Sequence, residues 1–327
     1  MTNAKVFITR RIPAAGLDLL RGAAELDIWQ DELPPPYETL VARSRGCAGL
    51  LTLLSDRIDG TLMDAVGPQL KVIANYAVGF DNIDVPAATA RRIPVSNTPG
   101  VLTETTADFA WTLLMAAARR VVEGDLNTRG GQWKTWGPSI LLGRDVFGAT
   151  LGIIGFGRIG QAVARRARGF SMRVLYYDTQ RYPEAEAELG AVYAPFETVL
   201  AEADYLSIHT ALTPETRHLF STDQFARMKN TAILINTARG PIVDEAALYQ
   251  ALAHGQIAYA GLDVTEVEPL PMSSPLLQLR NIIIAPHIAS GSVQTRDKMA
   301  IIAAQNVLAG LNGQKLPACV NPQVYAK

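Results

Sequence analysis

Short apolar stretches alternate with longer amphipathic ones along the first hundred residues. The stretches with the character of buried strands are residues 5–9, 26–29, 48–54, 70–77 and 93–97. The stretches between them have the apolar spacing of helices, and they cover residues 14–23, 37–46, 60–66 and 85–92. Strands that alternate with helices form a mostly parallel sheet covered on both faces. The pattern therefore predicts an α/β unit here.

A long helical stretch and a second alternating series follow. The apolar spacing predicts one helix over residues 103–127, and a loop rich in glycine and tryptophan comes after it. Strand-like stretches then recur at residues 151–156, 173–178, 191–194, 205–210, 232–237, 258–264 and 281–287. A last helical stretch covers residues 293–313. The second series also predicts a doubly wound parallel sheet.

The composition and charge argue against nucleic acid and membranes as partners. Apolar residues make up 48% of the 327 residues and charged residues 19%, which is typical of a globular protein. The net charge of −1 and the scattered basic residues give no electrostatic footprint for nucleic acid or an anionic membrane. The longest apolar stretch, residues 109–118, is too short to span a bilayer. We therefore expect neither nucleic-acid nor membrane partners.

The two cysteines, Cys47 and Cys319, lie far apart in the sequence. Neither belongs to a C-x-x-C motif or to a cysteine–histidine cluster, so no metal site and no disulfide framework are expected. The first residues also lack the apolar core of a signal peptide. Together these features predict a cytoplasmic protein.

One segment carries a specific motif, "LGIIGFGRIGQAVARRARGFSMRVLYYD", residues 151–178. Gly155, Gly157 and Gly160 form a G-x-G-x-x-G pattern between a strand-like and a helical stretch. The first glycine permits a tight turn, the second lets the backbone approach a pyrophosphate, and the third allows close packing. The N-terminus of the helix offers N–H groups to the phosphates. The motif therefore predicts a dinucleotide ligand and hydride transfer.

Asp178, at the end of the next strand, indicates which dinucleotide is bound. A carboxylate there accepts hydrogen bonds from the adenosine ribose and repels a 2′-phosphate, so NAD is favoured over NADP. Arg181 lies close enough in the sequence to leave NADP open.

The motif begins in the middle of the chain, which bears on domain organisation. We expect two Rossmann-like domains, each a doubly wound parallel sheet. The dinucleotide-binding domain, residues 101–289, would be inserted into a substrate domain formed by residues 1–100 and 290–327.

Hydride transfer to a carbonyl needs a proton donor, and a cation for any substrate carboxylate. His209 and His287 each end a strand-like stretch, and position alone does not separate them. Arg239 follows the strand-like stretch 232–237, and its planar guanidinium suits a carboxylate. Three carboxylates follow another strand-like stretch, at Asp263, Glu266 and Glu268.

Four motifs together resemble the D-isomer-specific 2-hydroxyacid dehydrogenase family, and the resemblance covers essentially the whole chain. They are "GFGRIG", "NTARGPIVDEAAL", "GLDVTEVEP" and "APHIAS". The segments "NYAVGFDNIDVPAATARRIPVSNTPGVLTETTADFAW" and "GDLNTRGGQWKTW" resemble its glyoxylate/hydroxypyruvate reductase branch more closely. The resemblance implies NAD(P)H-dependent reduction of a small 2-oxo acid, such as glyoxylate to glycolate or hydroxypyruvate to D-glycerate.

The resemblance also implies roles for single residues. Arg239 would bind the substrate carboxylate and carbonyl oxygen, His287 would be the acid/base, and Glu268 would hydrogen-bond to the histidine. The backbone of Val78 and Gly79 would cradle the substrate carboxylate. The remaining substrate-binding position is Leu53. The cofactor contacts would be Gly155, Phe156, Gly157, Arg158, Ile159, Gly160, Asp178, Thr237, Ala238, Asp263 and Ala289, the last replacing a glycine that many members have.

The resemblance also bears on the oligomeric state and on the choice of substrate. It implies a homodimer formed through residues 103–140. Other readings within the family are a D-lactate-type enzyme and a phosphite dehydrogenase, and Val78 stands where the latter has a lysine. An NAD-sensing, corepressor-like binding protein would have the same fold. The sequence does not rank the 2-oxo acids.

Overall fold

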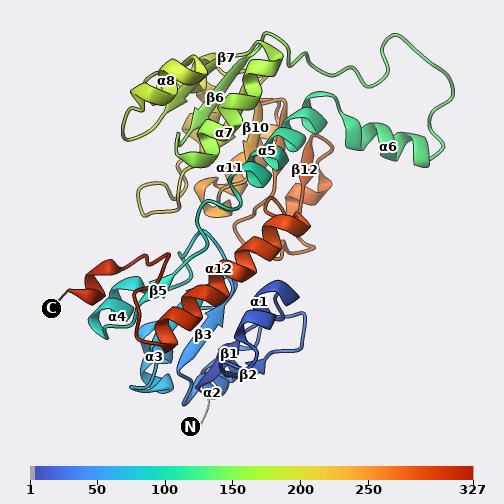
Figure 1. The fold of residues 1–327 in the computed structure, drawn as a ribbon. Helices are drawn as coiled ribbons and strands as arrows, with labels where there is room; N and C mark the ends of the chain where they lie inside the picture. The colour runs from blue at the N-terminus through green and yellow to red at the C-terminus, as the bar shows by residue number, and fades with distance from the viewer. Residues whose placement is uncertain (1–3, 327) are drawn as a thin grey trace. The chain divides into compact units, whose positions relative to one another are not determined.

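The computed structural model describes residues 4–326, which form two compact α/β units (Figure 1). The first contains the residues up to Leu102 and those from Gly291 onward, and the second runs from Thr103 to Ser290. Each unit is built on a parallel sheet with interleaved helices. This confirms the predicted fold class of two Rossmann-like, doubly wound units.

The first unit has a five-stranded parallel sheet in the order β2-β1-β3-β4-β5. Its strands are β1 (Lys5–Ile8), β2 (Glu25–Ile28), β3 (Gly49–Thr52), β4 (Val72–Asn75) and β5 (Val95–Ser96). Its helices are α1 (Ala14–Leu20), α2 (Tyr37–Ser44), α3 (Gly60–Val66), α4 (Val85–Ala90) and α12 (Val293–Leu311). Every residue of β3 and β4 is buried, as expected for strands covered on both faces.

Helix α12 belongs to the first unit although it comes from the far end of the chain. It packs on α1, β3 and β4. The first unit is therefore completed by residues that follow the whole of the second.

The second unit has a seven-stranded parallel sheet in the order β12-β11-β10-β9-β6-β7-β8. Its strands are β6 (Thr150–Ile154), β7 (Arg173–Tyr177), β8 (Ala191–Tyr193), β9 (Tyr205–Ile208), β10 (Ile233–Asn236), β11 (Tyr259–Leu262) and β12 (Ile282–Ile284). The chain winds outward from β6 in both directions, so the switch point of the sheet lies between β6 and β9. Open α/β sheets bind ligands at the carboxyl ends of the strands beside such a point.

The helices of the second unit are α5 (Thr103–Ala118), α6 (Val121–Arg129), α7 (Arg158–Ala167), α8 (Pro183–Leu189), α9 (Phe196–Glu202), α10 (Thr222–Arg227) and α11 (Glu245–Ala253). All of them except α6 contribute buried residues to the apolar layers on the two faces of the sheet. Ile153 joins the apolar core that contains α5 and α7, whereas Ile154 joins the core that contains α9, α10 and α11. Successive strand residues thus alternate between two apolar layers. Short 3₁₀ helices occur at Arg168–Phe170, Gly240–Ile242, Pro275–Gln278 and, in the first unit, Pro322–Tyr325.

The single helix predicted over residues 103–127 is wrong, because two helices occupy this stretch. Helix α5 ends at Ala118, and Arg120 adopts a left-handed conformation with φ of 53° before α6 begins. Helix α6 buries none of its residues. Figure 1 shows α6 and the loop after it projecting from the rest of the second unit.

Candidate active site

The glycine-rich turn directly after β6 has the geometry that its motif predicts. Gly155 has a φ of 89°, and a Cβ there would lie 2.6 Å from the carbonyl carbon of His209. A Cβ on Gly160 would lie 2.2 Å from the Gly155 oxygen. A Cβ on Gly157 would meet no heavy atom within 4 Å. The outer two glycines therefore permit close backbone packing, and the middle one leaves open space above the turn.

Asp178 lies beside this turn. It directly follows β7, and its Oδ2 accepts a hydrogen bond of 2.6 Å from the Phe156 N–H. Helix α7 begins at Arg158, and no side chain caps it at Gly157. The open space, the uncapped helix start and the carboxylate fit the pyrophosphate and ribose of a dinucleotide.

His209 follows β9 at the switch point. Its Nε2 lies 2.8 Å from the Ser207 hydroxyl, and desolvation lowers the pKa of the imidazole to about 3. The ring is therefore neutral at physiological pH and holds no extra proton to donate. This separates it from His287, to which sequence position alone gives equal weight.

The strand registers bring the other candidate residues to the same edge of the sheet. Asn236 pairs with Ile208 and with Leu262, and Leu262 pairs with Ile284. The segments that follow these strands therefore leave the sheet side by side. They carry His209, Thr237, Ala238, Arg239, Asp263, Glu268 and His287.

Glu268 and His287 form a direct pair. His287 Nδ1 lies 2.7 Å from Glu268 Oε2. The His287 side chain is 24% exposed and the Glu268 side chain is 32% exposed. Because Nδ1 faces the carboxylate, Nε2 is the ring nitrogen left to meet a substrate. A carboxylate hydrogen-bonded to Nδ1 fixes the orientation of the ring.

Asp263 shapes the turn that carries His287. Its carboxylate accepts hydrogen bonds of 2.7 Å from the N–H groups of Ile288 and Ala289, and its own carbonyl accepts one of 2.8 Å from the His287 N–H. Burial raises the pKa of Asp263, while these hydrogen bonds lower it. Ala289 itself is buried.

Arg239 follows β10 in a turn held by a buried asparagine. Asn236 Nδ2 donates to the Arg239 carbonyl at 2.9 Å, and Asn236 Oδ1 accepts from the Ala238 N–H at 3.0 Å. The hydroxyl of Thr237 is buried, and no hydrogen bond to it occurs within residues 4–326. A polar group of a ligand could satisfy this hydroxyl.

The turn of Arg239 lies directly against the loop that leads to Glu268. A Cβ on Gly240 would lie 1.9 Å from the Thr265 carbonyl oxygen, so only glycine fits there. Glu266, in that loop, accepts from the Glu245 N–H at 2.8 Å and lies 3.3 Å from His218. All three carboxylates that follow β11 accept hydrogen bonds from backbone N–H groups, and Glu268, which accepts from the Thr265 N–H at 3.2 Å, is the one that also faces His287.

The first unit holds the other candidate residues at the carboxyl edge of its own sheet. Leu53 follows β3, and Val78 and Gly79 follow β4. Asn75, Asn82 and Asn97 bind the backbone of these loops through their side-chain amides. None of these three asparagines was among the residues predicted from the sequence. The only signal was that Asn97 ends the strand-like stretch 93–97 and that Asn75 is a polar residue within the apolar stretch 70–77.

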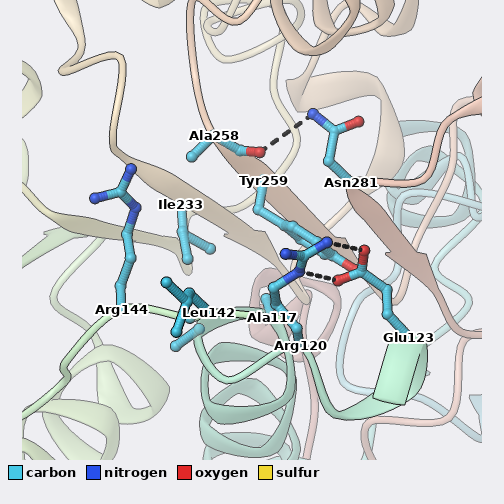
Figure 2. A pocket seen from close by; sticks show the side chains of 11 residues that line it. Ala117, Arg120, Glu123, Leu142, Arg144, Ile233, Ala258, Tyr259 and Asn281 are labelled. Atoms are coloured by element: carbon cyan, nitrogen blue, oxygen red, sulfur yellow. Dashed lines mark hydrogen bonds and ion pairs between the residues drawn. The ribbon is translucent and has the colours of Figure 1, made fainter. Parts of the chain in front are cut away.

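A cavity of about 240 Å³ lies at the opposite, amino end of the second sheet (Figure 2). Tyr259, at the start of β11, points toward the Arg120–Glu123 ion pair, whose bonds measure 2.8 Å. The Tyr259 hydroxyl is buried without a hydrogen-bond partner in the described part of the chain. Ile233 begins β10 beside this cavity, whereas Arg239 follows the end of β10. The cavity is therefore separate from the candidate active site.

Within residues 4–326, none of the helices is both long enough and apolar enough to cross a bilayer. In the same range, no group of three or more histidine, cysteine or acidic side chains is placed to hold a metal ion.

Comparison with known proteins identifies the family. Residues 111–289 match the model for "D-isomer specific 2-hydroxyacid dehydrogenase, NAD binding domain". A glyoxylate reductase from Korarchaeum cryptofilum is 54% identical over 321 residues, which are 98% of this chain and 96% of that protein. A glyoxylate reductase from Thermococcus kodakarensis is 51% identical over 98% of this chain and 97% of its own length.

Solved structures agree. The TT0316 protein from Thermus thermophilus has a TM-score of 0.91 at 48% identity, covering 97% of this chain and 99% of that one. An NADPH-dependent glyoxylate/hydroxypyruvate reductase from Sinorhizobium meliloti, solved with NADP and malonate, has a TM-score of 0.85 at 32% identity, covering 98% and 97%. The chain belongs to the D-isomer-specific 2-hydroxyacid dehydrogenase family and is an NAD(P)-dependent oxidoreductase.

Proposed function

We propose that this enzyme reduces glyoxylate to glycolate and hydroxypyruvate to D-glycerate, with NADH as the preferred cofactor. The observation that carries the proposal is the Glu268–His287 pair, at 2.7 Å, on the sheet edge that also carries Arg239 and the dinucleotide turn. The names of the most similar relatives support the same reaction.

The protein side chains would do the acid/base and binding work. Bound NADH would supply a hydride to the carbonyl carbon. His287 would deliver the proton to the carbonyl oxygen from Nε2, because Nδ1 faces Glu268. Arg239 would hold the substrate carboxylate and the carbonyl oxygen through its guanidinium.

The preference for NADH rests on Asp178. Its carboxylate lies beside the Phe156 N–H, where a ribose diol would be bound and a 2′-phosphate repelled. The remaining cofactor contacts would come from residues 155–160, from the segment Thr237–Arg239 that carries the unsatisfied Thr237 hydroxyl, and from Asp263 and Ala289.

One unit would bind the cofactor and the other would bind the substrate. The unit from Thr103 to Ser290 would be the dinucleotide-binding domain, and the other unit would be the substrate domain. The backbone of Val78 and Gly79 would receive the substrate carboxylate, and Leu53 would contribute to substrate choice.

A homodimer formed through α6 and the loop after it is part of the proposal. This segment exposes many large apolar side chains, which are Val121, Val122, Leu126, Trp133, Trp136, Ile140, Leu142 and Phe147. Exposed apolar surface of this extent is typical of a protein interface. Cys47 and Cys319 are both free, which fits the reducing conditions of the cytoplasm.

The test combines a substrate panel with one substitution. Wild-type enzyme should reduce glyoxylate and hydroxypyruvate faster with NADH than with NADPH. His287→Ala should lower kcat by about 10²- to 10⁴-fold, the usual contribution of a positioned acid/base. The Kd of NADH, measured by fluorescence titration, should stay within about twofold because the dinucleotide turn is unchanged.

His254→Ala is the matched control, because His254 is exposed and bonds only to the Gln250 carbonyl among the described residues. It should leave both quantities unchanged. Loss of NADH binding with surviving turnover in His287→Ala would contradict the assignment. A wild-type enzyme that reduced none of these acids would contradict the proposed function.

A further inference from the structure

Three successive carbonyl groups after β4 are each held by a hydrogen bond from the same unit. The Ala77 oxygen accepts from the Thr98 N–H at 2.9 Å. The Val78 oxygen accepts from Asn97 Nδ2 at 2.8 Å, and the Gly79 oxygen accepts from Asn75 Nδ2 at 2.9 Å. Two of these three donors are side-chain amides, so side chains set the orientation of the loop.

Each of these hydrogen bonds also sets the direction of an N–H group. A trans peptide is planar, and its N–H points away from its C=O. The bonds to Ala77, Val78 and Gly79 therefore turn the N–H groups of Val78, Gly79 and Phe80 away from the donors. None of these three N–H groups donates a hydrogen bond to any residue in the range 4–326. Successive N–H groups without partners in that range are available to an anion, as in the anion-binding turns of other proteins.

The two asparagines are themselves fixed. Asn75 is fully buried at the end of β4, and its Oδ1 accepts from the Thr52 hydroxyl at 3.0 Å. Its Nδ2 also donates to Asn82 Oδ1 at 3.0 Å. Asn97 directly follows β5, and its own N–H donates to the Ala318 carbonyl at 3.3 Å. Asn75 is thus anchored to the sheet through Thr52, and Asn97 is anchored where it directly follows β5.

The same network reaches the loop after β3. Asn82 Nδ2 donates to the carbonyls of Leu53 and Asp56, each at 3.0 Å. The Leu53 N–H donates to Asp56 Oδ2 at 2.7 Å. The loops that carry Leu53 and Gly79 are therefore braced against each other.

We propose that Asn97 and Asn75 are positioning residues for substrate binding: their side-chain amides hold the peptides of Val78 and Gly79 so that the N–H groups receive a substrate carboxylate. This inference rests on the proposed function, in which the backbone of Val78 and Gly79 binds the 2-oxo acid. It adds that the arrangement is set by two asparagine side chains, neither of which needs to touch the substrate.

Asn97→Asp is the sharpest test, because it keeps the shape of the side chain and replaces the donor with a negatively charged acceptor. The carboxylate would repel the Val78 carbonyl and release the peptide. The KM for glyoxylate and the dissociation constant of oxalate, a dicarboxylate, should each rise about 10- to 100-fold, as for loss of a hydrogen bond to a charged group. The kcat should fall by a smaller factor. The Kd of NADH should not change, because the dinucleotide turn belongs to the other unit.

Asn321→Asp is the matched control. Asn321 is also fully buried in the first unit, and its Nδ2 donates to the Ile93 carbonyl at 3.0 Å, near the start of β5. This variant should lower the melting temperature without raising the KM. Asn97→Ala removes the donor without adding charge, and it should change the KM in the same direction if Asn97→Asp fails to fold.

The outcomes separate this inference from the proposed function. Wild-type turnover combined with an unchanged KM and unchanged oxalate binding in both Asn97 variants would overturn the inference alone. A wild-type enzyme that binds oxalate in calorimetry but reduces no 2-oxo acid would overturn the function. In that case, weaker oxalate binding by Asn97→Asp would still support the inference. Absence of oxalate binding to the wild-type enzyme would overturn the inference.

Discussion

His287 adopts a left-handed backbone conformation, with φ of 55°, which few residues other than glycine adopt. The buried carboxylate of Asp263 holds this turn through two hydrogen bonds from the residues that follow the histidine. Backbone conformations of this kind persist where the surroundings over-determine them, and they concentrate at functional sites. Asp263 therefore has a structural task in addition to the cofactor contact proposed for it.

Gly240→Ala should damage stability and catalysis together. The added Cβ would lie 1.9 Å from the Thr265 oxygen, so the loops of Arg239 and Glu268 must move apart. We expect a loss of about 1–3 kcal/mol in the free energy of unfolding, the usual cost of overpacking, measured by urea denaturation. The kcat/KM for glyoxylate should also fall.

Gly169→Ala is the control, since a Cβ there meets no heavy atom within 4 Å. It should leave kcat/KM unchanged. A Gly240→Ala enzyme with wild-type kcat/KM would show that the two loops need not pack this closely.

His209 should make the apoenzyme less stable in mild acid. Desolvation lowers its pKa from 6.5 to about 3, so below pH 6.5 the unfolded chain binds a proton that the folded chain does not. Stability from this residue is therefore lost as the pH falls from 6.5 toward 3. Between pH 7 and pH 5, the free energy of unfolding should therefore decrease by about 2 kcal/mol because of this residue.

The measurement compares urea unfolding at pH 7 and pH 5 in the wild type and in His209→Asn, which does not titrate. The difference between the two pH values should be about 2 kcal/mol smaller in the variant. His254→Asn, at an exposed position, should behave as the wild type. An equal pH dependence in all three proteins would argue against a neutral buried imidazole.

At the scale of elements, α6 differs from the other long helices because it buries none of its residues. Most helices are stabilised mainly by packing an apolar face. The apolar side chains of α6 and its loop are instead exposed, with Leu126 at 63% and Trp136 at 80%. This segment is therefore where the proposed contact with a second copy would bury the most apolar surface.

Leu126→Glu should shift the enzyme from dimer toward monomer at micromolar concentration, because a charge would be buried in the interface. Light scattering coupled to gel filtration measures the change. Leu33→Glu is the control, since Leu33 is 69% exposed but lies in the first unit, away from α6 in the sequence. A Leu126→Glu protein with the mass of the wild type would count against this interface.

The break between α5 and α6 shows what a periodic pattern cannot predict. Residues 103–127 keep a helical apolar spacing across the break, so the sequence predicts one helix. The break depends on the left-handed conformation of Arg120, a residue type without a preference for that conformation. By contrast, the strands that follow were predictable, because buried parallel strands are short apolar runs bounded by turns.

At the scale of the whole molecule, the sequence predicted both parallel sheets, and the structure brings three of the candidate site residues to one sheet edge. Arg239, Glu268 and His287 each follow a strand, and parallel strands bring their carboxyl ends to the same edge. The roles of Asn75 and Asn97 could not be predicted in this way. Asparagine is common after any strand, and only the folded loops show which carbonyl each amide holds.

The packing of α12 on α1, β3 and β4 has a consequence for biosynthesis. When the ribosome has released the chain through Ser290, every residue of the second unit is available to fold. At that moment, the apolar surface of the N-terminal segment that α12 will cover is still exposed to solvent. The residues up to Leu102, which are most of the first unit, must therefore remain incompletely folded while the whole second unit is translated. During this interval the nascent chain most needs protection from aggregation.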